Sequence, residues 1–549
     1  MLKKLIYLSF VFNSFFLNAQ NIDWTYGFGE ANWIDSKSVL IDNQDNIYVL
    51  GRFSDSIDID PSSSNIYLYN EFGGSYLQKL NAKGELLWAK NIFTTHSVFG
   101  SVMQFDKDSS IIISGIVTVF EGKYGFCSKL DKEGNLIWFK PILYIQNYGI
   151  NLDSYIITDV SVGNNNSIYC LGTFINDLTD YSVSNPIFDI SKDFFIQKFD
   201  LNGNILWTKI IGGKSDDIAN AMTIDSDNNL YITGSFRGTV DFDTSNDTLN
   251  KVSNGSSDVF ILKLNETGNL IWVESFGSNS HDFATDITIK QNNNLIIAGA
   301  FSDTLSFNNE IEFSNGLHDA FILELDTQKN YIWSKKIGGT KNDYIENVLV
   351  NEQNNIYIIG NFNDTVNFET EYFYGVQNLR NKFIQKIDGN KNTLWNINYI
   401  HGFKNVPHFN FNSNFTLDSK NNLCVIGQYS DTLFLNITPN SEETESNGKF
   451  NVYIFKINQT IETSLVDKGH IEIKTYPNPT NKFYNIVLKN KSSSAEIRIY
   501  DSTGKICKSD ILKHQKSSID ISTLKNGLYF IQIELSSGEI INTKLQITK

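Results

Sequence analysis

The sequence is poor in cysteine, in proline and in positive charge. Four Cys among 549 residues cannot form a disulfide framework, and no Cys or His pair has the spacing of a metal site. Seven Pro exclude collagen-like and proline-rich chains. The formal net charge of −16 excludes nucleic-acid binding through bulk electrostatics and disfavours an anionic membrane surface.

Long apolar runs are absent after the N-terminal segment. Lys3 and Lys4 precede an apolar run from Leu5 to Leu17, and the small residue Ala19 follows. This order is typical of a secretory signal peptide, which we place at residues 1–19. The run is shorter than the ~20 residues that a membrane-spanning helix needs. We therefore predict export by the Sec machinery and a mature protein without a transmembrane anchor.

The sequence does contain an internal repeat. Seven of the eight Trp stand in the same local phrase, at an average spacing of about 62 residues, which is typical of propeller or array units. Six of them have an aromatic residue 12 positions earlier, and five have a Gly 27 positions later. The seven are Trp24, Trp88, Trp138, Trp207, Trp272, Trp333 and Trp395.

Each repeat unit predicts four β-strands. Residues 230–236 (LYITGSF) alternate as a half-buried strand does, and Asn, Asp and Gly separate the strand segments. Gly84, Gly134, Gly203 and Gly268 mark hairpin turns, where Gly supplies a positive φ. Closing such units into a ring hides the sheet edges that a linear array would expose. We therefore predict an all-β protein, with a seven-bladed β-propeller of four-stranded blades over residues 22–458.

The predicted binding face is the one that carries the longest connections. Loops between the third and fourth strands of a unit vary in length, and the "GGKSDD" loops emerge on the same side. Variable loops on a rigid scaffold usually carry function. Two sets of Asp fall on this face: Asp217, Asp282 and Asp343, and Asp193, Asp258 and Asp319.

The two Asp sets have two interpretations. A ring of carboxylates could hold Ca²⁺ or a polar ligand, since hard cations prefer several oxygen ligands. The interpretation that we favour is that each Asp satisfies loop amides once per repeat. No cofactor is predicted, and calcium is the one that the pattern allows. His281 and His318 adjoin Asp282 and Asp319, but no Ser-nucleophile or metalloprotease motif accompanies them, so no catalytic or metal-binding residue is predicted.

The repeat resembles a known family. The phrases "GGKSDDIANAMTIDSDNNLYITGSFRGTVDF" and "DVFILKLNETGNLIW" are similar to the bacterial seven-bladed β-propeller repeat. The resemblance implies a propeller fold and leaves the biochemical activity open.

The composition changes after residue 458. Residues 459–470 predict a polar linker, and residues 471–549 predict a small Ig-like β-sandwich. This segment resembles the type A C-terminal sorting domain of the Bacteroidota type IX secretion system. The resemblance implies export through the type IX translocon to the medium or the outer cell surface. The matching residues are Tyr476, Pro477, Asn478, Pro479, Gly504, Gly527, Tyr529, Lys544 and Lys549.

Two functions are open at this point. The uniform units and the lack of a catalytic set favour a non-enzymatic binding or scaffold propeller, with an extracellular glycan or protein as its ligand. The alternative is a secreted polysaccharide hydrolase or lyase, which needs two carboxylates from different blades in the central funnel. Unit two, with its missing loop, and unit seven, with His401, Lys404 and His408, break the repeat and are the places where we expect a specific site.

Overall fold

The chain divides into two compact units, residues 1–461 and 462–549. The structure, a computed structural model, describes residues 21–547 apart from the segments 143–155, 178–189, 402–412, 460–472, 477–482 and 489–494 and shorter breaks at 32, 63, 65, 94–96, 120–121, 246, 308–309, 369–371, 377–379, 431, 438–439, 446–449, 502–504, 513–515 and 536–539. The predicted signal peptide and residues 460–470 of the predicted linker lie outside the described residues. Over the described ranges, we find no helix with the length and apolar character to cross a membrane.

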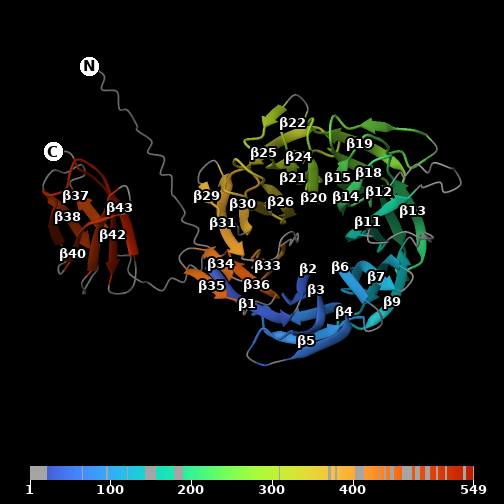
Figure 1. Cartoon of the computed structure of the whole chain (residues 1–549), viewed down its shortest axis with the longest axis horizontal. Helices are drawn as coiled ribbons and strands as arrows, with labels where there is room; N and C mark the ends of the chain where they lie inside the picture. The colour runs from blue at the N-terminus through green and yellow to red at the C-terminus, as the bar shows by residue number, and fades with distance from the viewer. Residues whose placement is uncertain are drawn as a thin grey trace, which may run out of the picture. The chain divides into compact units, whose positions relative to one another are not determined.

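The first unit consists of antiparallel four-stranded groups, and in all but the last of them the chain runs from an innermost strand outward (Figure 1). The innermost strands are β2 (Ile34–Ile41), β6 (Ser97–Phe105), β10 (Ile156–Val162), β14 (Ile218–Ile224), β20 (Phe283–Ile289), β26 (Tyr344–Val350) and β32 (Asn414–Leu417). The second strands are β3 (Ile47–Asp58), β7 (Ile111–Val119), β11 (Ile168–Asp177), β15 (Leu230–Phe236), β21 (Leu295–Phe301), β27 (Ile356–Phe362) and β33 (Leu423–Tyr429). The third strands are β4 (Tyr67–Leu80), β8 (Gly122–Leu130), β12 (Ile190–Phe199), β18 (Asp258–Leu264), β24 (Asp319–Leu325), β30 (Arg380–Ile387) and β36 (Phe450–Asn458). The outer strands are β5 (Leu86–Asn91), β9 (Leu136–Ile142), β13 (Ile205–Ile211), β19 (Leu270–Phe276), β25 (Tyr331–Ile337), β31 (Thr393–His401) and β1 (Asn21–Ala31).

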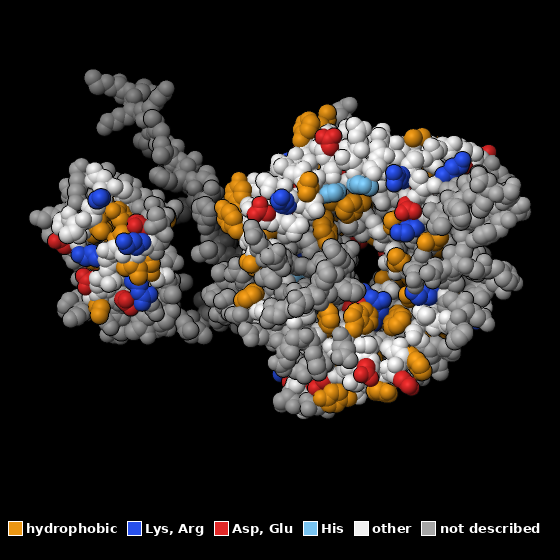
Figure 2. Space-filling view, viewed as in Figure 1, with side chains coloured by type: hydrophobic (Ala, Val, Ile, Leu, Met, Phe, Trp, Pro, Cys, Tyr) orange, Lys and Arg blue, Asp and Glu red, His pale blue; other side chains and the backbone are white. Residues whose placement is uncertain are grey.

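The innermost strands form a closed circuit. Contacts run from β2 through β6, β10, β14, β20 and β26 to β32, which contacts β2 again. Figure 1 shows the sheets arranged around a centre, and Figure 2 shows an opening there. The circuit is sealed by β1, which pairs antiparallel with β36 from Asn21↔Asn458 to Ala31↔Phe450. The N-terminal strand therefore completes the last sheet.

The Trp strand of each repeat unit belongs to the preceding sheet. Trp207 lies on the outer strand β13, whereas the next segment of the same unit is β14 of the following sheet. Its indole Nε1 donates to the Glu266 carbonyl, 3.2 Å away, in a turn of that following sheet. Trp138 binds Leu201 O in the same way at 3.0 Å. The repeat unit thus straddles two sheets, and its Trp ties them together.

The repeated Gly and the repeated aromatic residue lie opposite each other on the second and third strands. At Gly234 an added Cβ would lie 1.9 Å from Ile218 O, and at Gly427 it would lie 2.1 Å from the Tyr453 hydroxyl. Neither position has room for a side chain, which explains why Gly recurs there. The pairs are Gly51↔Tyr76, Gly115↔Phe126, Gly172↔Phe195, Gly234↔Phe260, Gly299↔Phe321, Gly360↔Phe383 and Gly427↔Tyr453.

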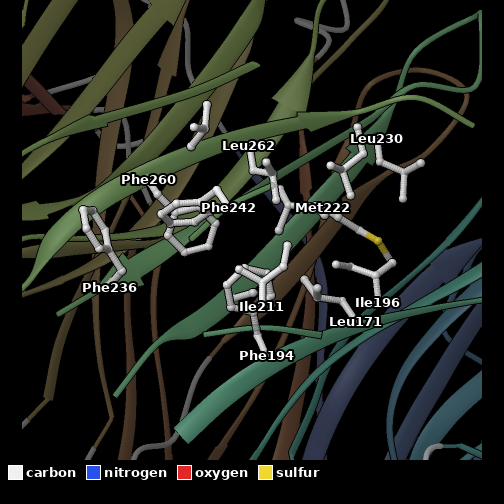
Figure 3. Packing of buried hydrophobic residues seen from close by; sticks show 14 of the residues in the cluster. Leu171, Phe194, Ile196, Ile211, Met222, Leu230, Phe236, Phe242, Phe260 and Leu262 are labelled. Carbon is white, nitrogen blue, oxygen red and sulfur yellow. The ribbon is translucent and has the colours of Figure 1, made fainter. Parts of the chain in front are cut away.

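Apolar side chains fill the space between neighbouring sheets. In Figure 3, Leu171 and Phe194 of one sheet face Met222, Phe260 and Leu262 of the next. The rings of Phe194 and Phe260 stack with centroids 5.2 Å apart and planes inclined by 11°. Each fully buried side chain of this kind contributes roughly 1.5–3 kcal/mol, so the packing between sheets stabilises the ring.

Short hairpins extend the connections between the second and third strands. The repeated phrases "GTVDF", "DTLSF" and "DTVNF" supply the first strand of three separate two-stranded sheets. A fourth hairpin pairs with β31 instead. The hairpin strands are β16 (Thr239–Asp241), β17 (Asn250–Val252), β22 (Thr304–Phe307), β23 (Glu310–Phe313), β28 (Thr365–Asn367), β29 (Tyr372–Tyr374), β34 (Thr432–Ile437) and β35 (Asn440–Glu445).

The second unit contains two antiparallel sheets, ordered β37-β38-β41 and β40-β39-β42-β43. A single buried cluster includes Ile519 in the first sheet and Ile497 and Ile531 in the second. Of the predicted sorting motif, Pro477, Asn478, Pro479, Gly504 and Lys549 lie outside the described residues. Tyr476 ends β37, Gly527 and Tyr529 lie in β42, and Lys544 lies in β43. The strands are β37 (Ile473–Tyr476), β38 (Phe483–Leu488), β39 (Ala495–Tyr500), β40 (Ile506–Leu512), β41 (Lys516–Asp520), β42 (Gly527–Leu535) and β43 (Ile540–Ile547).

Candidate functional site

One face of the first unit carries two kinds of connection. They are the loops from an outer strand to the next innermost strand, and the loops between second and third strands. Isolated bridges join the two kinds, at Ser257↔His281 and at His318↔Asn342. We call this side the loop face; Figure 2 shows His side chains on it.

The first predicted Asp set anchors these loops. Asp217 is fully buried, and its two carboxylate oxygens accept the backbone N–H groups of Gly213 at 2.7 Å and Arg237 at 3.0 Å. Burial raises the pKa of Asp217 to about 7 and the pKa of Asp343 to about 8. The equivalent bonds are Asp282 to Ser278 and Ser302, and Asp343 to Gly339 and Asn363.

The second predicted Asp set lies next to the first. Asp258 Oδ2 accepts the Asn254 N–H at 3.0 Å, and an added Cβ on Gly277 would lie 2.6 Å from its carboxyl group. Burial, with a smaller contribution from the charge of Asp282, raises the pKa of Asp258 to about 6. The same charge coupling, with burial as the larger cause, links Asp193 to Asp217 and Asp319 to Asp343.

The structure therefore brings the two Asp sets together in pairs, across neighbouring sheets. Their oxygens are turned into the loops and not toward solvent. Within the described part of the chain, no group of three or more His, Cys, Asp or Glu side chains is placed to hold a metal ion.

The other polar motifs also hold loops. His281 contacts the hydroxyls of Ser256 and Ser257 at 3.0 and 3.2 Å, and His318 Nδ1 lies 3.1 Å from Asn342 Oδ1. Neither histidine hydrogen-bonds to a carboxylate. The Oδ1 of Asp225 accepts two backbone N–H groups of its own hairpin turn, so this carboxylate stabilises the turn.

Asp159 and Asp286 lie on the innermost strands β10 and β20. Burial raises the pKa values of Asp159 and Asp286 to about 7. Asp159 accepts the Met222 N–H of the next innermost strand at 2.8 Å, and Asp286 accepts the Val348 N–H at 2.7 Å. Their second oxygens accept the N–H of the following residue, Val160 or Ile287. Both carboxylates therefore bind adjacent sheets together.

A charged cluster that the repeat pattern did not predict lies at the loop-face end of β2. We call Asp35, Lys37 and Arg52 the mouth cluster. Arg52 donates to Asp35 from Nε at 3.1 Å to each oxygen and from Nη2 at 2.5 Å, and Lys37 Nζ lies 3.0 Å from Asp35 Oδ2. Lys37 occupies a β-bulge, because the β2–β3 register shifts between Ser36 and Ser38.

The mouth cluster is open on its cationic side. The Lys37 and Arg52 side chains are 27% and 19% exposed, whereas Asp35 is buried. Arg52 lies over the rings of Trp33 and Phe99, at 5.3 and 5.8 Å from their centroids. Despite its burial, Lys37 and Arg52 hold the pKa of Asp35 below its usual value. Figure 2 shows Lys or Arg side chains beside the central opening.

A second ion pair that the sequence did not predict is buried from solvent. Lys382 Nζ lies 2.6 Å from Glu346 Oε1, and both side chains are buried. Glu346 Oε2 accepts the Ser413 N–H at 3.1 Å. Of the three residues predicted to mark a site in unit seven, His401 is buried, and its Nδ1 lies 2.8 Å from the Gln428 carbonyl oxygen. Lys404 and His408 lie outside the described residues.

A family model described as a secretion system C-terminal sorting domain matches residues 474–548. Those residues are a type IX sorting domain. A second model, described as a beta-propeller repeat, matches residues 206–235, which run from the Trp207 strand through β14 to β15. The chain is thus a secreted or cell-surface protein that contains propeller repeats.

The relatives are distant. The chain is 26% identical over 254 residues to an uncharacterized WD repeat-containing protein, L264, of Acanthamoeba polyphaga mimivirus, covering 40% of this chain and 18% of that protein. It is 23% identical over 195 residues to the regulatory protein FlaEY of Caulobacter vibrioides, covering 34% and 20%. The chain therefore spans about a fifth of the length of these curated relatives.

Solved structures to which the chain is similar include two bacterial proteins. A DUF4221-family protein of Bacteroides vulgatus is 10% identical, with 81% of this chain and 99% of that chain covered and a TM-score of 0.32. PorZ, a surface component of the type IX secretion system of Porphyromonas gingivalis, is 10% identical, with 94% and 81% covered and a TM-score of 0.19.

The sequence signal of the mouth cluster is a pair of charged residues at a position that is uncharged in two other sheets. The register partners Ile218↔Ser235 and Phe283↔Ala300 occupy the same position in two other sheets. In the first sheet this position holds Asp35↔Arg52. A charged pair that replaces a mostly apolar one identifies the cluster through its departure from the repeat.

Proposed function

We propose that the chain is an exported seven-bladed β-propeller, residues 22–458, that acts as a non-enzymatic binding or scaffold module. The binding face is the loop face, and the ligand is an extracellular glycan or protein. The closed circuit of innermost strands and the β1–β36 pairing support the blade number.

The proposed route of export follows from the two ends of the chain. Residues 1–19 act as a signal peptide for the Sec machinery of a Bacteroidota-type cell, and residues 459–470 link the propeller to the sorting domain. Residues 471–549 form an Ig-like sandwich that engages the type IX translocon. The family match at residues 474–548 supports this assignment.

One observation carries the binding function. The repeated carboxylates of the loop face accept backbone N–H groups of their own loops, so they are occupied in holding the scaffold. The charged side chains that do not repeat, Lys37 on the innermost strand β2 and Arg52 on β3, retain exposed surface. A scaffold of this kind, with one distinct charged patch, suits recognition.

The alternative function is a polysaccharide hydrolase or lyase with its site in the funnel. The raised pKa values of Asp159 and Asp286 favour it, because a glycosidase needs a carboxylic acid that stays protonated near neutral pH. Against it, both oxygens of each carboxylate accept backbone N–H groups. A candidate acid that binds the channel wall in this way is poorly placed to protonate a substrate.

The test is a binding screen of the full chain against a panel of polysaccharides and bacterial surface extracts. We expect saturable binding that is lost when the hairpin 304–313 or 365–374 is shortened, and no release of reducing sugar. Release of sugar that Asp159→Asn and Asp286→Asn abolish would replace the binding function with the hydrolase. No saturable binding to any member of the panel would contradict the binding function.

A further inference from the structure

We propose that the mouth cluster is a binding site for the anionic group of an acidic glycan, a carboxylate or a sulfate ester. This inference rests on the proposed function and names the ligand class for it. It starts from the charge of the cluster. Two cations face one carboxylate, so the cluster carries a net charge of about +1 while all three groups are ionised, in a chain whose net charge is −16. Burial lowers the pKa of Lys37, and the charge of Asp35 opposes that shift.

The donors of the cluster are not all used. Arg52 donates from Nε and Nη2 to Asp35, and among the described residues its Nη1 makes no hydrogen bond. Lys37 Nζ has Asp35 as its one ion-pair partner in the same part of the chain. An ammonium has three N–H donors and a guanidinium has five. Donors from both side chains are therefore available to an anionic oxygen.

The cluster is organised before any ligand binds. Asp35 fixes the guanidinium of Arg52 by three contacts, and the Trp33 and Phe99 rings flank it. A guanidinium that is already held loses little side-chain entropy when it binds a carboxylate or a sulfate. Arg52 therefore serves as the rigid part of the site.

Lys37 differs from the residues at the same bulge in other sheets. Asn220 Nδ2 donates to Ala284 O at 2.7 Å, and Thr285 Oγ1 donates to Ile345 O at 2.8 Å. These side chains connect one innermost strand to the next. Lys37 instead turns its ammonium toward Asp35 on its own strand and stays 27% exposed. The bulge residue in the first sheet is thus released from the structural role that it has elsewhere.

The surrounding charge favours a glycan over a more densely charged polymer. The chain as a whole repels polyanions. An acidic polysaccharide offers one anionic group per charged sugar among neutral hydroxyls, so it can place a single anion at the cluster with little further repulsion. The half-buried indole of Trp33 adds a flat apolar surface beside the cations.

The experiment measures binding of the full chain to three polymers: polygalacturonate (carboxylate), dextran sulfate (sulfate ester) and unmodified dextran (neutral). We expect at least one of the two anionic polymers to bind, at least tenfold more weakly after Lys37→Gln. Its binding should also weaken as salt rises, since the contact is ionic. Dextran should not bind. The polymer that responds to Lys37→Gln tells the carboxylate from the sulfate.

The control is Lys214→Gln, which removes an equal charge from an exposed position on the same loop face. It should leave binding within twofold of the parent. Lys37→Gln keeps the Asp35–Arg52 contacts, so an unchanged melting temperature will show that it folds. Equal losses in the two variants, or no loss in either, would overturn the inference. Binding of dextran that neither variant changes would overturn it as well, while leaving the proposed binding function intact.

Discussion

The sheets β14–β19 and β20–β25 use their buried polar side chains differently from the sheets β2–β5 and β26–β31. The latter two flank the sheet that is closed by the pairing of β1 with β36, which we call the seam. In the former, buried Asp residues accept loop amides, and the pattern repeats from one sheet to the next. Near the seam, charged pairs replace uncharged positions, as at Asp35–Arg52 and Glu346–Lys382. The repeated residues maintain the ring, and the departures from the repeat are where individual chemistry enters.

The largest expected effect is on the seam side of this comparison. Lys382→Met removes one partner of the buried pair with Glu346 and should lower the free energy of unfolding by about 3–5 kcal/mol, because the remaining carboxylate is buried without its cation. Urea unfolding followed by Trp fluorescence measures this, since all eight Trp lie in residues 1–461.

The double variant Glu346→Gln with Lys382→Met serves as the control for that prediction. It removes both charges and should recover most of the lost stability. A single variant that unfolds within about 1 kcal/mol of the parent would show that the pair is not buried as described.

A loop-anchoring Asp in a repeated sheet should give the next largest effect. Asp282→Ala leaves the buried N–H groups of Ser278 and Ser302 without an acceptor, at about 1–3 kcal/mol for each group. We expect a loss of about 3 kcal/mol in total. Asp247→Ala, at an exposed position, should change stability by less than about 0.5 kcal/mol. Equal losses in the two variants would contradict the anchoring role.

The pH dependence should separate the repeated loop-anchoring Asp residues from Asp35 of the mouth cluster by sign. Burial raises the folded-state pKa values of Asp217 and Asp343 to about 7 and 8, above the unfolded value of 3.8. Between about pH 4 and 8 the folded chain therefore binds more protons than the unfolded chain. The free energy of unfolding decreases through these groups as the pH rises across that window. Asp35 has a lowered pKa, so its contribution is present above its unfolded pKa and is lost as the pH falls through the folded pKa.

Melting temperatures of the chain from pH 4 to pH 9 measure this dependence. Asp343→Asn removes one group with a raised pKa and should make the decline between pH 5 and pH 8 shallower. A profile as steep as that of the parent would contradict the assignment of the decline to these carboxylates.

The smallest expected effect concerns the contact between sheets. Trp207→Phe removes the hydrogen bond from Nε1 to Glu266 O and part of the ring, which should cost about 1–2 kcal/mol in the unfolding experiment. The matched change Trp33→Phe removes the Trp that stands outside the repeat. It should cost less stability, and it should alter acidic-glycan binding instead.

Much of the propeller scaffold was predictable because its constraints recur. The Gly-to-aromatic spacing predicted a pair of structural positions, and residues such as Gly234 and Phe260 lie opposite each other on adjacent strands. The hairpin glycines Gly84, Gly134 and Gly203 have φ values of 81°, 76° and 76°, which confirms the predicted positive φ.

Two features were not predictable from spacing. The first is that the Trp strand belongs to the preceding sheet. The contact of Trp207 with Glu266 crosses between two sheets, so the spacing groups segments of both sheets into one repeat unit. The mouth cluster was missed because it occurs once, with Asp35 and Arg52 separated by 17 residues and brought together by strand pairing. A search for regularity detects the scaffold and overlooks a site that occurs once.

The pairing of β1 with β36 has a consequence for how the molecule is made. After its synthesis, β1 must wait for β36, the last described strand of the first unit, across more than 400 residues from Asn21 to Asn458. Until then β36 lacks its outer neighbour and presents a free edge that can recruit another chain. Such distant pairing is slow to form, since the entropy of closing the intervening chain is lost before any contact compensates for it. Ring closure is therefore the step of biogenesis at which this protein most needs protection from aggregation.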